Sequence, residues 1–183
     1  MVFVRIHLIK GRLTAQQKQD LGAKLIQAVA DVEGLVNNDH HKQTSWVQFF
    51  EFEPENWYAP VNLPGADPDS KIQLDVITPQ KLLATPEEAR TMLGKANQAV
   101  REVLGPGALP AHGPWVHVHI TPFDQWAMDG RIPDWEGFRA HLRAETPQQA
   151  EAALAIVYGP GRHTGTGLSS YTDTLAYEEG AHA

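Results

Sequence analysis

The 183-residue sequence contains no cysteine, which excludes disulfide bonds, thiol nucleophiles and zinc–thiolate sites. No apolar run approaches the length that crosses a membrane, and the beginning of the chain lacks the apolar core of a secretion signal. Lysine and arginine total 15 against 22 acidic residues, and they form no basic run. The formal net charge of -7 therefore disfavours nucleic-acid binding. We expect a cytoplasmic protein that binds neither nucleic acid nor membrane.

The first fourteen residues predict a strand followed by a basic turn. Apolar side chains at positions 2, 4, 6 and 8 alternate with Phe3, Arg5 and His7, which is the period of a half-buried strand. Lys10-Gly11-Arg12 ends the pattern, and Thr14 opens a helix. Because the strand begins at the chain terminus, we expect the α-amino group and the Arg12 guanidinium near one sheet.

Two helices carry matching start and stop signals. Thr14 with Gln17, and Thr85 with Glu88, have the spacing of a capping box. Glycines at positions 34 and 105 stop the two helical patterns, each 20 positions after its threonine. The equal lengths indicate an internal repeat.

The segments after these helices also match each other. Trp46-Val47-Gln48-Phe49 leads to Trp57, and Trp115-Val116-His117-Val118 leads to Trp126, with each tryptophan pair 11 positions apart. A further alternating strand begins at Ile72. The chain therefore reads as a β-α-β unit made twice with a period near 70, and strands joined by a crossover helix lie parallel. This predicts an α+β fold: a four-stranded mixed sheet with two helices on one face, plus short C-terminal helices and a tail.

We expect one domain over residues 1–145, with repeats at 1–64 and 70–131, and a C-terminal helix with a mobile tail over 146–183. Alternation in the strands places Phe3, Arg5 and His7 on the side of the sheet away from the helices, together with His117 and His119. A polar face with aromatic residues is expected to be buried between subunits. Trp46 and Trp115 recur at matched positions and are interpreted as packing anchors.

These residues carry a family resemblance over roughly residues 2–140. Ile6-His7-Leu8-Ile9-Lys10-Gly11-Arg12 followed by a capped helix resembles the opening of 4-oxalocrotonate tautomerase. The duplicated layout, and Trp115-Val116 leading to Pro122, resemble cis-3-chloroacrylic acid dehalogenase. Both belong to the tautomerase superfamily. The resemblance implies a homotrimer, sites at the strand ends, and chemistry by an amino-terminal proline that acts as a base or an acid.

The sequence departs from this pattern at the proline, because Val2 follows Met1. Initiator methionine is often removed before valine, and a primary amine on Val2 could act as a base or form an imine; alternatively Met1 stays and Val2 is only a strand residue. The resemblance makes Arg12 a clamp for a substrate carboxylate, with a solvated loop arginine as the alternative. It also places His117 where the dehalogenase has a site tyrosine, which suggests a proton donor or a residue that orients water.

The remaining candidates would bind substrate. Trp57 and Trp126 could line an apolar pocket, His119 shares a face with His117, and Asp129 could replace the glutamate of the dehalogenase or belong to a simple turn. His117 and His119 could instead hold a metal with His7 or Asp129, or form a polar pair at a subunit interface.

The resulting hypothesis is cofactor-free proton transfer, either keto–enol tautomerisation or hydration, on a small α-keto or unsaturated carboxylate. Val2 would supply the base, Arg12 the carboxylate clamp and His117 the proton donor. The alternative is a catalytically diverged or inactive superfamily member that binds a small ligand or a biosynthetic intermediate. A third interpretation, an assembly protein, rests on the C-terminal tail alone.

Overall fold

The structure, a computed structural model, describes residues 2–35, 42, 45–57, 72–83, 85–105, 113–127 and 134–158. Its main body is one β-α-β unit made twice. The first unit is β1 (Val2–Ile9), α1 (Ala15–Glu33) and β2 (Ser45–Phe52), and the second is β3 (Ile72–Pro79), α3 (Pro86–Leu104) and β4 (Trp115–Thr121). The duplicated α+β architecture expected from the sequence is therefore confirmed.

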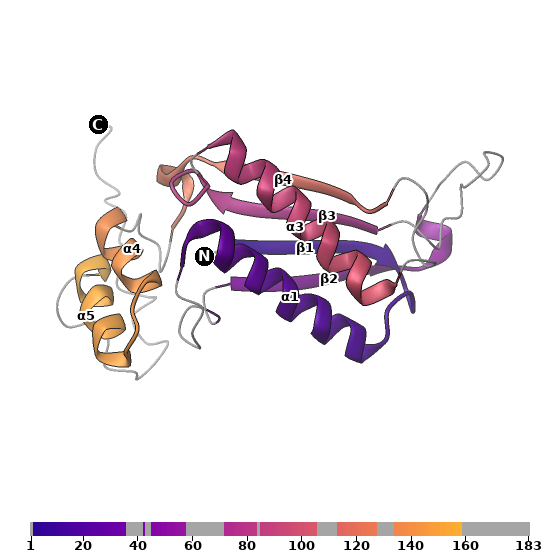
Figure 1. Ribbon diagram of the computed structural model, residues 1–183, viewed down its shortest axis with the longest axis horizontal. Helices are drawn as coiled ribbons and strands as arrows, with labels where there is room; N and C mark the ends of the chain where they lie inside the picture. The colour runs from indigo at the N-terminus through magenta and orange to yellow at the C-terminus, as the bar shows by residue number, and fades with distance from the viewer. Residues whose placement is uncertain are drawn as a thin grey trace, which may run out of the picture.

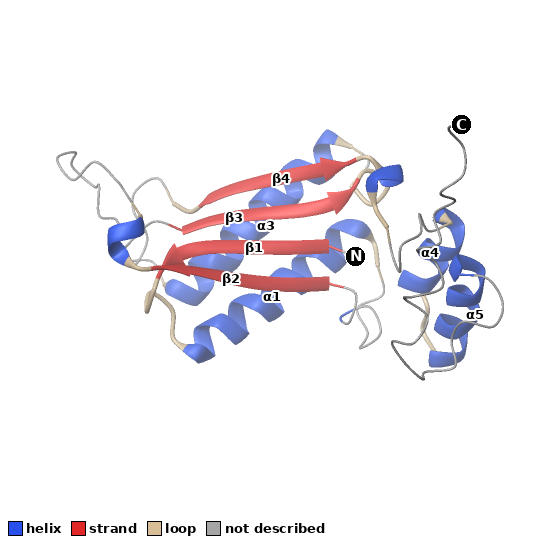
Figure 2. Ribbon diagram, turned by 180° about the vertical axis from the view of Figure 1, so that it is seen from behind, coloured by secondary structure: helices blue, strands red, loops and turns tan. Residues whose placement is uncertain are grey.

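The four strands form a single mixed sheet in the order β2-β1-β3-β4. Within each unit the two strands are parallel, as a crossover helix requires, and the units meet through the antiparallel pair β1 and β3. Both α1 and α3 cover the same face of this sheet, and the view from behind shows the four strands in front of the helices (Figures 1 and 2). We call the side of the sheet away from α1 and α3 the open face.

The helices begin and end where the sequence places their caps. The Thr14 hydroxyl accepts a hydrogen bond from the Gln17 amide at 3.2 Å, and the Gln17 side chain accepts one from the Thr14 amide at 2.9 Å. Thr85 and Glu88 make the same pair of bonds at 3.2 and 2.9 Å. Gly34 ends α1 with a φ of 61°, a left-handed conformation that glycine adopts without strain. Both predicted capping boxes are confirmed.

The core lies between the sheet and the two long helices. Alternate residues of β1 and β3 point into it, and Ile6 and Leu74, which pair across the two strands, are fully buried. The helices contribute apolar residues spaced by about one turn, which are Leu21, Leu25 and Val29 from α1 and Met92, Ala96 and Val100 from α3. Burial on the helix side leaves the other alternate residues of each strand on the open face.

Two short helices follow the sheet. Asp134 caps α4 (Trp135–Leu142) by accepting a hydrogen bond from the Gly137 amide at 2.8 Å, and Thr146 caps α5 (Pro147–Tyr158). Phe138 and Leu142 of α4 pack with Leu82, just after β3, in a second apolar cluster. The pair lies beyond one end of the sheet (Figure 1). The residues between the two expected repeats, 65–69, and the chain after residue 158 lie outside the described residues.

Among the described helices, none is both long enough and apolar enough to cross a membrane.

Candidate functional site

Side chains of all four strands meet on the open face in three rows. Cross-strand pairing gives the rows Trp46–Phe3–Ile77–His119, Gln48–Arg5–Asp75–His117 and Phe50–His7–Gln73–Trp115. Successive positions of a strand point to opposite faces, so these twelve side chains share one side of the sheet. The middle row sets Arg5 of the first repeat directly beside Asp75 of the second.

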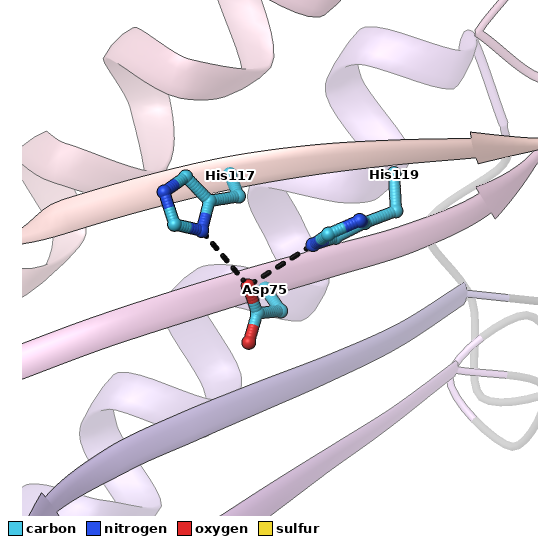
Figure 3. A group of neighbouring side chains, drawn as sticks. All are labelled: Asp75, His117 and His119. Atoms are coloured by element: carbon cyan, nitrogen blue, oxygen red, sulfur yellow. Dashed lines mark hydrogen bonds and ion pairs between the residues drawn. The ribbon is translucent and has the colours of Figure 1, made fainter.

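Asp75 is the centre of this surface and binds three histidines. The ring nitrogens His117 Nδ1 and His119 Nε2 lie 3.1 and 3.0 Å from the same oxygen, Asp75 Oδ1 (Figure 3). His7 Nε2 lies 3.2 Å from the other oxygen, Oδ2, to which Gln73 also donates a hydrogen bond at 3.2 Å. The sequence places these histidines on one side of the sheet but does not identify Asp75 as the group that binds all three.

The charge on Asp75 is stabilised by these neighbours. Partial burial opposes ionisation, but the hydrogen bonds from His119, His117 and Gln73 outweigh it, so that the pKa of Asp75 is lowered below its ordinary value. A hollow of about 500 Å³ lies over this carboxylate, lined also by Arg5 and Ile77. The open face therefore combines a fixed carboxylate, imidazole nitrogens and a guanidinium around one depression.

A second polar group lies at the beginning of β1, on the helix side of the sheet. Phe3 of β1 pairs with Ile77 of β3, so the next pair outward brings Val2 beside Thr78. The Val2 side chain is buried. The Thr78 hydroxyl is also buried and donates a hydrogen bond at 3.0 Å to Oε1 of Glu33, the last residue of α1. Oε2 of Glu33 is buried and has no hydrogen-bond partner in the described part of the chain.

This environment makes Glu33 a weak acid. Burial raises the pKa of Glu33 to about 7, against the opposing effects of the positively charged amino terminus and the Thr78 hydrogen bond. An acidic residue at a helix C-terminus also faces the negative end of the helix dipole. Sequence alone does not point to Glu33, because its only signal there is an acid directly before the helix-ending Gly34.

Trp126 lies near the same end of β1. Its ring stacks on Phe3 with centroids 5.4 Å apart and planes 5° from parallel. The indole Nε1 is buried and donates to no group among the described residues. A buried donor of this kind is available to an acceptor on a ligand.

Arg12 and Trp57 lie at the opposite end of the sheet. β1 is eight residues long, which at about 3.3 Å per residue separates its two ends by more than roughly 20 Å. Lys18 binds Glu51 at 2.7 Å in the same region, and Trp57 contacts Phe52 edge to face with centroids 5.4 Å apart. Arg12 is half-buried. A single chain therefore does not bring Arg12 to Val2.

Two further predictions from the sequence concern the strand tryptophans and Asp129. Trp46 and Trp115, interpreted as packing anchors, are 52% and 63% exposed because both lie on the open face. Within one chain they do not anchor the core, and that interpretation was wrong. Asp129, a candidate for substrate binding, lies outside the described residues.

Solved structures show the same fold. A fused 4-OT, described as a wild-type asymmetric trimer, matches with a TM-score of 0.55 at 14% identity over 70% of this chain and 94% of that one. N1, a member of the cis-3-chloroacrylic acid dehalogenase family, matches with a TM-score of 0.60 at 16% identity over 83% and 98%. A malonate semialdehyde decarboxylase matches with a TM-score of 0.53 at 17% identity over 71% and 93%.

In sequence, no family model and no curated protein matches the chain. The structural matches confirm the expected tautomerase-superfamily fold, and at these identities they establish the fold alone.

Proposed function

We propose that this chain, whose fold is that of the tautomerase superfamily, catalyses proton transfer on a small α-keto or unsaturated carboxylate without a resident cofactor. The reaction is keto–enol tautomerisation or hydration, and its centre is the end of the sheet where β1 begins. One observation carries the proposal: the buried Glu33 carboxyl, held by Thr78 beside Val2. Two structural neighbours, a member of the cis-3-chloroacrylic acid dehalogenase family and a malonate semialdehyde decarboxylase, are also named after small carboxylic acids.

The base in this proposal is the amino group of Val2 after removal of Met1. An α-amine has an ordinary pKa near 7.7–8.0, so it needs a partner to be neutral at physiological pH. Because the pKa of Glu33, about 7, lies within roughly one unit of that value, Glu33 holds the shared proton part of the time, and the neutral amine then removes a proton from the substrate carbon next to the carbonyl. The amine returns that proton to the other end of the enolate. Glu33 acts through the amine, since its own oxygens are covered.

The substrate carboxylate is bound by donors on either side of this centre. The Trp126 N–H, which lies next to Phe3 and has no acceptor among the described residues, is one such donor. Arg12 takes the role of clamp only if a second copy of the chain brings it to the beginning of β1. His117 as a proton donor stays a prediction, because its Nδ1 is already bound to Asp75.

The activity test follows the absorbance of an enolic α-keto acid in the presence of the native protein. Intact mass spectrometry checks that Met1 has been removed. We expect ketonisation above the buffer rate, and Glu33→Gln should reduce it by about 10²–10⁴-fold, the usual contribution of a proton-transfer partner. Glu151→Gln changes an exposed glutamate on α5 and should leave the rate unaltered.

Three results would contradict the proposal. The first is a wild-type rate equal to buffer in protein that lacks Met1, and the second is an active protein that retains Met1. The third is an active protein in which borohydride with a keto acid traps no adduct on Val2 and Glu33→Gln has the wild-type rate. Saturable binding of a keto acid without turnover would favour the alternative, a ligand-binding protein, for which the hollow beside Arg5 is the supporting observation.

We further propose a homotrimer that buries the open face. Trp46, Trp115 and Phe50 together give this face a group of large exposed apolar side chains, which is unusual for a free surface. Sedimentation equilibrium should give a mass three times the 20.2 kDa of one chain. Trp115→Glu should lower that mass, whereas Gln16→Glu on the exposed side of α1 should not; a wild-type monomer would refute the trimer.

A further inference from the structure

We infer that the open face is a binding site for a divalent transition-metal ion of the Zn²⁺ and Ni²⁺ class, with His117, His119 and Asp75 as ligands. One donor atom from each of the three residues lies within 4.8 Å of the other two. The two imidazole rings approach the carboxylate from β4, where they are two positions apart on the same face, and turn their nitrogens toward the same oxygen (Figure 3). The site lies across the sheet from Glu33 and uses neither Glu33 nor Val2, and it gives His117 a role as metal ligand in place of the predicted proton donor.

The distances suit a metal ion of this size. Ligands bound to zinc at about 2.0–2.1 Å in a tetrahedron lie roughly 3.3 Å from one another. His117 Nδ1 and His119 Nε2 lie 3.1 and 3.0 Å from Asp75 Oδ1, close to this separation, and the histidine donor atoms lie within 4.8 Å of each other, so rotation of the two rings lets a cation bind all three residues. In the single chain both histidines are about half exposed, at 49% and 54% of their side-chain surface, so an ion reaches them before the proposed trimer buries the open face.

The donor set also selects the class of metal. Two imidazoles and one carboxylate favour zinc, nickel, cobalt, copper or iron over calcium and magnesium, which prefer ligands made of oxygen alone. Three protein ligands leave coordination positions for water or another small ligand. The hollow of about 500 Å³ over Asp75 provides space for that ligand.

Hydrogen bonds from His7 and Gln73 fix the orientation of the Asp75 carboxylate. His7 Nε2 at 3.2 Å and the Gln73 amide at 3.2 Å both bind Oδ2, the same amide also donates to Oδ1 at 3.4 Å, and Oδ1 faces the two histidines of β4. Partners of this kind fix the orientation of a ligating carboxylate and typically affect metal affinity by about 10–100-fold. His7 is therefore a positioning residue for the metal.

The other half of the sheet supplies an internal comparison. Trp46 and Trp115 occupy equivalent positions, which makes Gln48 and Phe50 the counterparts of His117 and His119, and Arg5 the counterpart of Asp75. A guanidinium, a phenyl ring and an amide do not form a metal site. One metal ion per chain is therefore expected.

The test is calorimetric titration of the chelator-treated full chain with ZnCl₂ at neutral pH, supported by the visible spectrum of the Co²⁺ form. We expect one saturable site per chain and a Co²⁺ spectrum typical of nitrogen and oxygen ligands. His117→Gln and His119→Gln should each weaken binding at least about 100-fold, because losing a ligand exceeds the cost of losing an outer partner. His7→Gln should weaken it about 10-fold.

Controls separate this site from binding at other histidines. Asp20→Asn removes an exposed carboxylate on α1 that accepts a hydrogen bond from Gln16, and it should leave Zn²⁺ affinity unchanged. The substituted histidines are exposed, so circular dichroism of both variants should match the wild type. The inference is overturned if the wild type shows no saturable Zn²⁺ binding, or if the His117→Gln, His119→Gln double variant binds Zn²⁺ as the wild type does.

Discussion

Glu33→Gln is expected to raise the free energy of unfolding by about 3 kcal/mol at pH 8 and to leave it unchanged near pH 4. In the folded protein the pKa of Glu33 is about 7, whereas its ordinary value is 4.5, and each unit corresponds to about 1.36 kcal/mol. The folded state therefore binds the proton more tightly than the unfolded chain does. The contribution of protonated Glu33 to the free energy of unfolding is fully present below pH 4.5. It is lost as the pH rises through 7, where the buried carboxyl must ionise.

Urea unfolding of both proteins between pH 4 and 8 measures this effect. The wild type should lose stability over that range relative to Glu33→Gln, and the difference should level off above pH 7. Glu151→Gln should follow the wild type, because Glu151 is exposed. A constant difference between wild type and Glu33→Gln at all pH values would show that the pKa of Glu33 is the same in the folded and unfolded states.

The stability and activity of this variant should change in opposite directions. A buried carboxyl that weakens the fold at neutral pH has no structural advantage over the isosteric amide. If Glu33→Gln is more stable and less active, Glu33 has the trade-off typical of a residue kept for function. If it is more stable and equally active, the proposed role at the amino terminus is wrong while the pKa argument stands.

Leu74→Ala is expected to cost about 2–5 kcal/mol of stability, the usual range for a large side chain deleted from a close-packed core. Leu74 is fully buried at the centre of β3, where it pairs with Ile6 of β1. Ile77 lies three positions later on the same strand but faces the hollow on the open face. Ile77→Ala should therefore cost clearly less in a dilute, unassembled protein.

The comparison of these two variants tests the assignment of faces. Thermal and urea unfolding should be measured at concentrations at which the protein is a monomer and again at which it is assembled. The cost of Ile77→Ala should grow with concentration if copies bury the open face, because assembly then contributes to stability. Equal costs for both variants at every concentration would mean that the sheet has no distinct inner face.

The fold was largely predictable because its signals are local. The capping boxes at Thr14 and Thr85 involve residues three positions apart, and the alternation in β1 and β3 follows from the two-residue period of a strand. The match between Trp46 and Trp115 indicated the repeat. The error over these tryptophans arose because a spacing that recurs in both repeats shows that two positions are equivalent and not that they pack in the core; the alternation of β4 already puts Trp115 on the same side as His117 and His119.

The candidate site was less predictable because it depends on neighbours far apart in the chain. Asp75 is only the polar position of an alternating strand until β1 and β4 bring His7, His117 and His119 to it. Glu33 resembles a solvated residue at a helix end until Thr78 and burial are known. Val2 and Arg12 are close in sequence, yet the length of β1 places them at opposite ends of the sheet.

The pairing of Arg5 with Asp75 depends on the two halves being one chain. These residues occupy equivalent positions and face each other across the line about which the halves are related. A homodimer of separate single units would set two identical side chains against each other there, either two cations or two anions, which repel. Covalent duplication frees each partner to change alone, so a fused chain can hold opposite charges across its symmetry axis and the His117–His119 pair on one side of that axis.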